Sequence, residues 1–263
     1  MWRVIILRHL RVRPQLLAGL AAVVLVAYGI YSNGLTTVAN TVVRDTRPHV
    51  AGAMALAPPQ AHAPVDCGVQ ACLALTFDDG PSAESTPIIL DILARHQVRA
   101  TFFIMGSRVK GNEQLIRRMY QQGHEIGNHS WNHPRLSTLT PDQIRAQIDT
   151  TQAAIVAVGV PAPTLLRPPY GDTNGAVESL ASMSIALWNV DPQDWNHAKA
   201  EEIPPLVKAN VKPGRVVVMH DTHRPTADSL DVLLTDLQKD YKLVTFSELF
   251  NLSPGQPGRY YGR

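Results

Sequence analysis

Short apolar runs alternate along the chain with segments whose apolar side chains recur at helical spacing. The runs predict strands at residues 73–77, 99–105, 164–166, 186–190, 216–219 and 243–246. The segments between them predict helices at residues 87–96, 113–122, 141–158, 176–183, 200–209 and 229–239, with Thr140 as the N-cap of the third. Strands that alternate with helices favour a parallel sheet with right-handed crossovers. The pattern therefore predicts an α/β protein.

The two ends of the chain differ from this alternating body, which covers residues 67–252. Residues 1–43 combine clustered arginines with a long uncharged stretch and predict a signal or membrane anchor. Residues 44–66 are rich in alanine and proline and predict a linker. Residues 253–263 are rich in proline and glycine and predict a flexible tail.

The N-terminal segment predicts that the body is exported from the cytosol. Its strongly apolar part, residues 16–31, is short for a spanning helix of about 20 residues and slightly long for a signal-peptide core of about 7–15 residues. The preceding arginines place the N-terminus on the cytosolic side in either case. An uncleaved anchor that extends to Val38 and a signal that is cleaved near Ala39 or within residues 51–57 both stay open. We therefore expect a membrane-anchored protein at the extracytoplasmic face, or a secreted one.

The charge and the cysteine content indicate which kinds of partner and which cross-link to expect. The net charge is +2, but four arginines lie within the first 13 residues, and the remaining chain carries 20 basic against 22 acidic side chains. This balance argues against a nucleic-acid partner, which needs a basic footprint. Cys67 and Cys72 are the only cysteines. In an exported protein such a pair predicts a disulfide, and the alternative is that Cys72 packs in the first strand while Cys67 stays free.

Acids, histidines and one arginine are gathered in five blocks, each placed where a short apolar run ends. They lie in the blocks TFDDGP (76–81), NHSWNH (128–133), LLRPPYG (165–171), WNVDPQDW (188–195) and VVVMHD (216–221). If the strands are parallel, residues at successive strand ends meet at one rim, which is where the chemistry of barrel enzymes lies. The pattern therefore indicates one site built from all five blocks.

The first block holds two adjacent carboxylates, Asp78 and Asp79. Adjacent side chains of a regular strand point to opposite faces, so both face one pocket only if the strand ends there. Gly80 and Pro81 supply that end. Taken alone, the same letters are also typical of a turn or a helix cap.

The second block holds His129 and His133, whose spacing places them on one side of a helical turn that Pro134 would end. With an acid from another strand end they would supply three ligands and leave an open position, as in catalytic zinc sites. A surface loop is the alternative for both histidines.

The later blocks add an arginine, an acid and a further histidine. Arg167 precedes two prolines, whose stiff and extended chain would hold it beside an acid. Asp194 and His220 follow successive runs, and a carboxylate on a ring N–H raises the pKa of an imidazole, as a general acid requires. Taken alone, Arg167 could equally be an ordinary arginine in solvent, and His220 could be a buried histidine whose hydrogen bonds are all made.

Taken together, the five blocks resemble the motifs of the polysaccharide deacetylase family, the NodB-homology domain of carbohydrate esterase family 4. TFDDG, HSxxH, RPPYG, DxxDW and a final histidine block occur in order between Ala71 and Phe250. The resemblance implies a distorted (β/α) barrel of seven or eight units, with residues 67–252 as the catalytic domain. It also implies metal-dependent removal of acetyl groups from a polysaccharide.

The resemblance further implies which residues carry the reaction. Asp79, His129 and His133 would bind a divalent metal, with zinc expected first and cobalt or nickel as alternatives. Asp78 would act as the base that deprotonates water, and His220 as the acid that protonates the leaving amine.

Five other residues would support these groups. Arg167 would orient Asp78, and Asp194 would orient His220. The backbone N–H of Tyr170 would hold the oxyanion, and Trp195 and Val218 would form the walls of the pocket for the acetyl methyl group.

The chain departs from the family pattern at two positions. Val218 stands where leucine is common, which would widen the methyl pocket, and Pro192 replaces a small hydroxyl residue. Three further histidines lie outside the motifs: we expect His124 and His197 to be structural or exposed, and His223 to lie at the rim.

The expected substrate is an N-acetylhexosamine polymer, peptidoglycan first and chitin-type oligomers second. Acetylated xylan is an alternative, because the same groups can cleave an ester, and a non-catalytic envelope glycan-binding protein is another. The sequence contains neither GxSxG nor HExxH, so a serine esterase of the nucleophile-elbow type and the common metalloprotease pattern are unsupported. We expect a monomer.

Overall fold

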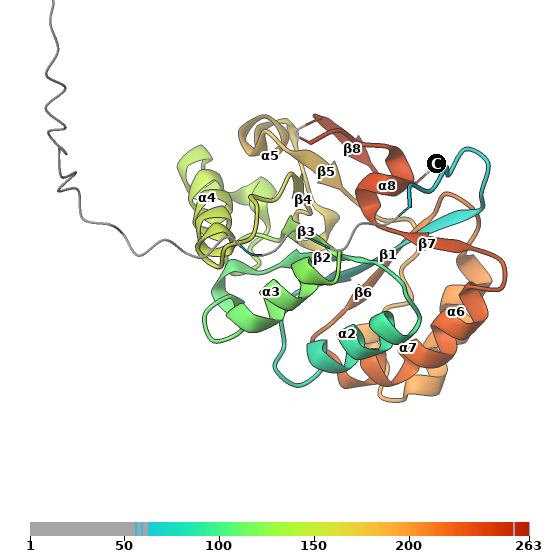
Figure 1. Cartoon of the computed structure of the whole chain (residues 1–263). Helices are drawn as coiled ribbons and strands as arrows, with labels where there is room; N and C mark the ends of the chain where they lie inside the picture. The colour runs from blue at the N-terminus through green and yellow to red at the C-terminus, as the bar shows by residue number, and fades with distance from the viewer. Residues whose placement is uncertain (1–55, 57–58, 60–62, 255, 263) are drawn as a thin grey trace, which may run out of the picture. The chain divides into compact units, whose positions relative to one another are not determined.

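The structure is a computed structural model that describes residues 56, 59, 63–254 and 256–262 (Figure 1). The chain divides into two units, residues 1–50 and 51–263. The predicted signal or anchor at residues 1–43 lies outside the described residues, as does most of the predicted linker. Within the described part of the chain, no helix has both the length and the apolar character needed to cross a membrane.

Eight parallel-paired strands form the centre of the second unit, in the order β6-β1-β2-β3-β4-β5-β8, with β7 also paired to β1. The strands are β1 (Cys72–Asp78), β2 (Thr101–Ile104), β3 (Glu125–Asn128), β4 (Leu165–Leu166), β5 (Ser184–Ala186), β6 (Val216–His220), β7 (Lys242–Val244) and β8 (Gly258–Tyr260). Val190 also pairs with Val217 of β6, which links the chain beyond β5 back to the other end of the strand order. The sheet is thus a distorted barrel, as predicted.

Helices lie around this sheet, and α2 and α7 pack side by side on its outside (Figure 1). The helices are α2 (Thr86–Arg95), α3 (Glu113–Gln121), α4 (Pro141–Ala157), α5 (Gly175–Ala181), α6 (Ile203–Asn210), α7 (Arg224–Leu237) and α8 (Phe246–Phe250). The predicted N-cap of α4 is confirmed, because the Thr140 hydroxyl accepts a hydrogen bond from the Gln143 N–H and the Gln143 side chain binds back to the Thr140 N–H.

The central strand β1 is buried on both of its faces, which explains its continuous apolar run. Leu73, Leu75 and Phe77 belong to the large apolar cluster shared with α2 and α7. Cys72 and Ala74 belong to a separate cluster with Phe246 and Leu249. Because side chains alternate along a strand, Thr76 and Asp78 share the face of Ala74. The strand therefore directs Asp78 away from the helices α2 and α7.

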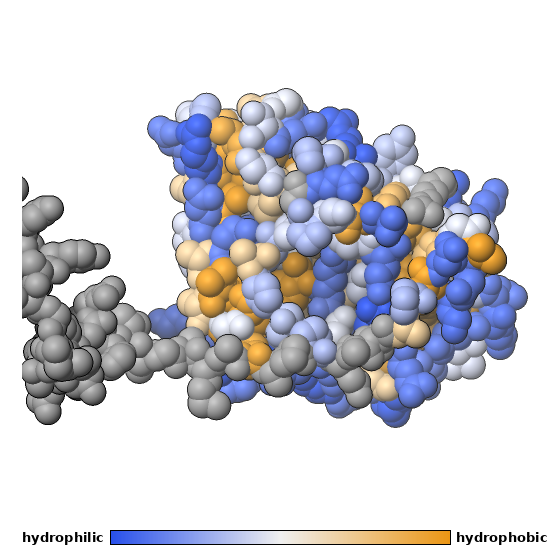
Figure 2. Space-filling view, turned by 45° about the horizontal axis from the view of Figure 1, so that its top comes forward, coloured by the Kyte–Doolittle hydropathy of each residue, from blue (hydrophilic) through white to orange (hydrophobic). Residues whose placement is uncertain are grey.

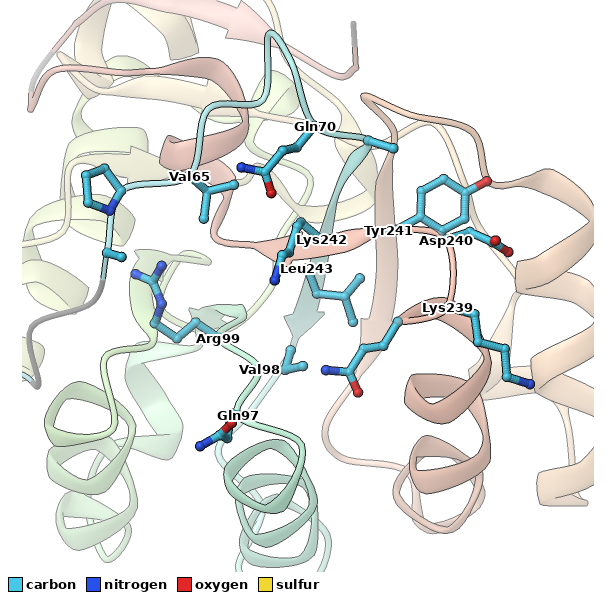
Figure 3. A pocket seen from close by; sticks show the side chains of 14 residues that line it. Val65, Gln70, Gln97, Val98, Arg99, Lys239, Asp240, Tyr241, Lys242 and Leu243 are labelled. Carbon is cyan, nitrogen blue, oxygen red and sulfur yellow. The ribbon is translucent and has the colours of Figure 1, made fainter.

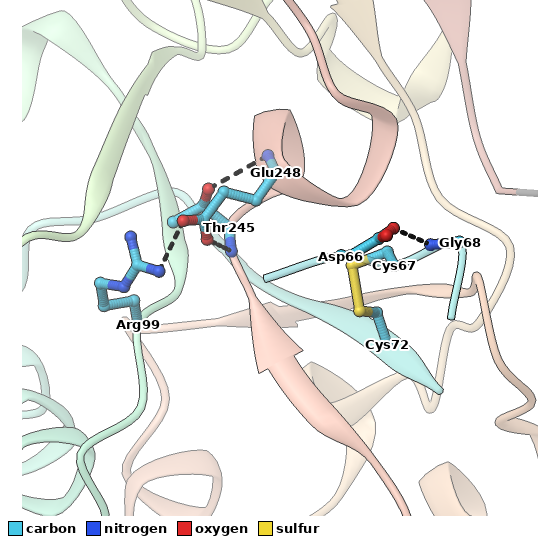
Figure 4. The surroundings of a disulfide bond; sticks show 7 residues. All are labelled: Asp66, Cys67, Gly68, Cys72, Arg99, Thr245 and Glu248. Atoms are coloured by element: carbon cyan, nitrogen blue, oxygen red, sulfur yellow. Dashed lines mark hydrogen bonds and ion pairs between the residues drawn. A yellow bond between two sulfur atoms is a disulfide. The ribbon is translucent and has the colours of Figure 1, made fainter. Parts of the chain in front are cut away.

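A disulfide between Cys67 and Cys72 fixes the segment that leads into β1, as the sequence predicts (Figure 4). Cys67 packs against the same cluster as Cys72. Beyond these buried groups, the face drawn in Figure 2 shows apolar residues in scattered patches between polar ones.

β3 lies where no strand was predicted, and two predicted strands have clearly different bounds in the structure. β5 ends at Ala186, earlier than predicted, because the chain then crosses the sheet: the Leu187 N–H donates to Tyr260 O of β8, and the Val190 N–H donates to Val216 O of β6. The predicted strand at residues 243–246 is shorter, because Thr245 forms a capping box with Glu248 and begins the helix α8.

The prediction of a flexible tail at residues 253–263 is wrong for residues 258–260, which form β8. β8 pairs with β5, and the Tyr260 ring packs 5.3 Å from the Phe250 ring, centroid to centroid. Arg259 forms an ion pair with Glu178 of α5. The proline and glycine content of the tail concealed this strand, whose partners in β5 and α5 are distant in sequence.

Candidate active site

A cavity of about 520 Å³ lies at the carboxyl ends of the strands. It is lined by Asp78, Asp79, His129, His133, Tyr170, Trp188, Asp191, Trp195, Val218, His220 and His223. The carboxyl ends of barrel strands are where active sites of this architecture form. Of the predicted catalytic, substrate-binding and metal residues, Arg167 and Asp194 do not line the cavity, and both are fully buried, at 0% exposure.

The two adjacent carboxylates reach this cavity because the strand ends between them. β1 ends at Asp78, and Asp79 has a φ of 72°, which interrupts the alternation of side chains. A cis peptide bond follows between Gly80 and Pro81. The condition inferred from the sequence, that β1 must stop here for both acids to face one pocket, is met.

Asp79, His129 and His133 form a cluster that fits a metal ion, with one ligand atom of each within 4.8 Å of the others. Asp79 Oδ1 lies 3.3 Å from His129 Nε2 and 3.4 Å from His133 Nε2. The same oxygen is buried and has no hydrogen-bond partner within the described residues. Carboxylate and imidazole are suitable donors for zinc and for other divalent transition metals. The donor set therefore fits the group that the sequence predicted.

The protonation states in this cluster favour metal binding. Burial works to raise the pKa of Asp79, but the nearby His129 and His133 outweigh it and hold that pKa well below its usual range. Burial, aided by the nearby His129, lowers the pKa of His133, which favours the neutral imidazole. His129 Nδ1 lies 2.7 Å from the carbonyl oxygen of Arg167 and can donate its N–H to that oxygen. The other ring nitrogen, Nε2, then faces Asp79.

The two histidines are not on a helical turn, so that expectation is wrong. They lie in a loop after β3 in which Ser130 and His133 each have a φ of 64°. Side chains replace helical hydrogen bonds there: the Ser130 N–H donates to Asn128 Oδ1, and the His133 N–H donates to Ser130 Oγ. Pro134, which disfavours helical geometry at the residue before it, agrees with this loop.

Arg167 lies behind Asp78 and holds it from inside the barrel. Its Nη1 donates to Asp78 Oδ1 and to Thr76 Oγ1, at 2.7 Å in each case, and its Nε donates to the Ala186 carbonyl. The guanidinium carbon lies 4.0 Å from the centroid of the Phe103 ring. Burial lowers the pKa of Arg167, whereas the charge and hydrogen bond of Asp78 act to raise it. The arginine is thus fixed in one position, as the two prolines after it suggested.

Asp194 and His220 form the second buried pair. His220 Nδ1 lies 2.8 Å from Asp194 Oδ1, while the His220 N–H donates to Asp194 Oδ2. Burial opposes the charged imidazole, but the hydrogen bond and charge of Asp194 outweigh it and raise the pKa of His220 to about 9. With Nδ1 bound to Asp194, the Nε2 of the ring is left for the cavity.

Sequence reasoning missed two hydroxyls that complete these pairs. Thr76 accepts from Arg167 and donates to the carbonyl of Val217, and Thr226 donates to Asp194 Oδ2 at 2.5 Å. Thr76 precedes Asp78 by two residues and so shares its strand face, which was a usable signal. Thr226 lies 32 residues from its partner on another element and gave no such signal.

Tyr170 and Trp195 both contribute aromatic side chains to the cavity lining; the sequence predicted a wall position for Trp195, but for Tyr170 only a role of its backbone N–H. Tyr170 and Trp195 are 58% and 52% exposed, so both present ring surface at the rim. Tyr170 has a φ of 62°, and its ring centroid lies 4.6 Å from that of His133. The next residue, Gly171, is confined to glycine by its φ of 66°, and an added Cβ would lie 3.1 Å from Trp188.

The histidines outside the motifs lie in three different places. His223 lines the cavity, with its ring centroid 6.1 Å from that of His220. His124 is buried and accepts a hydrogen bond from the Ala100 N–H, and His197 forms an ion pair with Glu202. All three agree with the expectations from the sequence.

A larger hollow, of about 750 Å³, lies at the opposite ends of the strands (Figure 3). Residues that precede β1 and β2, such as Gln70 and Arg99, line it together with Lys242 and Leu243 of β7. The cluster of close metal-ligating side chains found among the described residues lies in the smaller cavity. The smaller cavity is therefore the candidate active site, despite the size of this hollow.

Comparison with known proteins identifies the family. Residues 66–186 match the family described as Polysaccharide deacetylase. The chain is 37% identical over 191 residues to the peptidoglycan-N-acetylglucosamine deacetylase of Bacillus cereus, which covers 69% of this chain and 69% of that protein. The structure of a family 4 acetyl xylan esterase from Clostridium thermocellum in complex with a cobalt ion is similar, with a TM-score of 0.68 and 34% identity over 73% of this chain and 98% of that one. The chain belongs to the polysaccharide deacetylase family.

Another relative is much longer than the part of it that matches this chain. The chain is 44% identical over 179 residues to the peptidoglycan-N-acetylglucosamine deacetylase PgdA of Listeria monocytogenes. That match covers 68% of this chain but only 38% of the Listeria protein.

Proposed function

We propose that this chain is a metal-dependent hydrolase that removes N-acetyl groups from an N-acetylhexosamine polysaccharide. The observation that carries the proposal is the cluster of Asp79, His129 and His133 in one cavity with Asp78 and His220. A carboxylate held by a buried arginine and an imidazole held by a buried aspartate supply a base and an acid in that cavity.

Asp79, His129 and His133 are the residues that would hold a divalent metal ion, with zinc as the first expectation and cobalt or nickel as alternatives. When bound, such an ion polarises the acetamide carbonyl and lowers the pKa of water. The cobalt ion in the structure of the Clostridium esterase supports a divalent metal in this family.

The residues of the chain would move two protons. Asp78 accepts a proton from the attacking water, and Arg167 keeps the accepting carboxylate oriented. The amide C–N bond then breaks, and His220 donates a proton from Nε2 to the departing nitrogen while Asp194 stabilises the ring. The products are acetate and a sugar amine.

The rim residues would place the acetyl group. The backbone N–H of Tyr170 would donate to the developing oxyanion. Trp195 and Val218, both in the cavity lining, would enclose the methyl group. Val218 is smaller than leucine and would leave that pocket wider.

Peptidoglycan is the substrate that we propose first, and chitin-type oligomers second. Two relatives are named peptidoglycan-N-acetylglucosamine deacetylases, and a relative from Bradyrhizobium is named chitooligosaccharide deacetylase. The name of the Clostridium neighbour favours acetylated xylan as a further candidate.

We also propose that the protein acts outside the cytosol as a monomer, tethered by residues 1–43 or released after their cleavage.

Acetate release tests the proposal directly. The full-length protein, after chelation, is incubated with peptidoglycan, chitin pentamer or acetylated xylan, with and without zinc or cobalt. We expect metal-dependent release from one N-acetylated glycan. Asp78→Asn removes the base, which contributes typically about 10²–10⁴-fold, so it should abolish measurable turnover while metal stays bound. Retained turnover in Asp78→Asn would contradict the mechanism, and glycan binding without release by the wild type would favour a binding protein.

A further inference from the structure

One buried acid next to the cavity has no part in the reaction described above. Asp221 follows His220 and is only 1% exposed. Its Oδ2 accepts a hydrogen bond from Thr86 Oγ1 at 2.5 Å, at the start of α2. Its Oδ1 is buried and has no hydrogen-bond partner within the part of the chain that the structure describes. Such a group is costly to bury, so its position calls for an explanation.

The carboxylate of Asp221 fills the place where residue 80 would carry a side chain. A Cβ added to Gly80 would lie 2.1 Å from both Asp221 Oδ1 and Asp221 Oδ2. No positive φ is recorded for Gly80, so its backbone would accept alanine. Glycine is therefore required here by the close approach of Asp221 and not by backbone conformation.

The turn above Asp221 carries the carboxylate of the metal cluster. Asp79 has a φ of 72°, which residues with a Cβ adopt rarely, although aspartate adopts it more readily than most. The Asp221 N–H donates to the Asp78 carbonyl at 3.4 Å, and the Met105 N–H donates to the Gly80 carbonyl at 3.1 Å. Contacts thus hold the turn on both sides of Asp79.

Thr86 extends the same network beyond the turn. Its hydroxyl accepts a hydrogen bond from the Ser82 N–H at 2.8 Å while it donates to Asp221. The Asp221 side chain is thereby fixed between the end of β6 and the start of α2, directly against Gly80.

We propose that Asp221 is a positioning residue that supports the Asp79–Gly80 turn and so sets the place of the metal-binding carboxylate. The inference rests on the proposed metal site, but it concerns metal binding rather than turnover. Asp221 acts through Gly80 and need not contact the metal or the substrate.

The test is a double-mutant cycle on metal affinity in the chelated full-length protein, measured by zinc titration. Gly80→Ala and Asp221→Ala should each weaken zinc binding by about 10–100-fold, the range for residues that support metal ligands. The double variant should bind zinc more tightly than Gly80→Ala alone, because the new methyl group enters the space that Asp221→Ala vacates. Losses that simply multiply in the double variant overturn the proposal.

Two further variants separate positioning from general destabilisation. Asp221→Asn keeps the shape of the side chain and should retain near-wild-type zinc affinity; a loss equal to that of Asp221→Ala overturns a steric role. Gly175→Ala is the matched control, because a Cβ there meets no atom within 4 Å, and it should leave zinc affinity unchanged. Circular dichroism confirms that each variant is folded at the temperature of the titration. Lower thermal stability with unchanged affinity in the Gly80 and Asp221 variants would mean a merely structural role.

The zinc titrations can fail independently of the proposed deacetylase function, so the two failures can be told apart. If the wild type binds zinc but deacetylates none of the glycans, the function fails while the cycle still decides the role of Asp221. If the wild type binds no divalent metal at all, both the function and this inference are overturned.

Discussion

Two of the predicted site residues, Arg167 and Asp194, do not reach the cavity, yet each determines how a cavity residue is presented. Arg167 fixes Asp78 by an ion pair of 2.7 Å, and Asp194 holds His220 through both the ring and the backbone N–H. Both supporting residues are fully buried, and several hydrogen bonds hold each of their side chains in place. At the scale of the residue, the proposed base and the proposed acid are each held by a buried charge of opposite sign.

The pH dependence of turnover should report the pair of His220 and Asp194. Asp194 raises the pKa of His220 to about 9, and the charges of Asp78 and Asp79 act in the same direction. As a general acid His220 must be protonated, so kcat/KM should fall as the pH rises through the pKa of His220. In Asp194→Asn the counter-charge is lost, the pKa of His220 drops, and this decline should move to lower pH.

The measurement is the pH profile of acetate release for the wild type and Asp194→Asn under identical metal loading. Comparing the two proteins cancels the common effect of the metal on the imidazole. An alkaline decline at the same pH in both proteins would mean that it belongs to another group.

At the scale of the element, the disulfide and the site occupy opposite ends of β1. Cys72 begins the strand, while Asp78 ends it. The disulfide closes a short loop with a sequence separation of 5. Loop-closure entropy for so short a loop corresponds to about 2 kcal/mol of stability. Replacing both cysteines with serine should therefore lower the free energy of unfolding by that amount, as measured by urea denaturation, and leave kcat nearly unchanged. A large loss of kcat in the folded variant would contradict this separation.

The elements differ in how far the sequence alone specifies them. β1 and α4 were predictable because β1 is a continuous apolar run, while α4 has a capping box at Thr140. α8 has the same type of capping box, at Thr245, and that signal could have been used. β8 could not be predicted, because its pairing partner β5 is distant in sequence.

The residues of the site also divide into those with a local sequence signal and those whose role depends on distant contacts. Asp78, Asp79 and His220 were predictable because they lie at the ends of the apolar runs that form β1 and β6, whereas His129 and His133 follow β3, which was not among the predicted strands. Asp221 was visible in the sequence only as the residue after His220. Its contact with Gly80 joins positions 141 residues apart and depends on the parallel pairing of β1 with β6. Local patterns thus locate the reactive groups, whereas the groups that hold them depend on tertiary packing.

At the scale of the whole molecule, the three proposed metal ligands come from parts of the chain that follow different strands. Asp79 follows β1, while His129 and His133 follow β3, and β2 lies between these strands in the sheet. An ion held by all three residues binds the folded chain far better than the unfolded one. Binding of that kind stabilises a protein by about 2.7 kcal/mol when the free metal concentration is 100 times its Kd.

Removal of metal should therefore lower the thermal stability of the protein, reversibly. We expect chelation to lower Tm and added zinc to restore it, by about 2–4 °C per kcal/mol in a domain of this size. His133→Ala removes one ligand and should abolish most of the zinc-dependent rise. His197→Ala is the matched control, because His197 pairs with Glu202 outside the cavity lining, and it should keep the full rise. A zinc-dependent rise that survives in His133→Ala would place the stabilising ion elsewhere, because a site left with Asp79 and His129 alone would bind zinc much more weakly.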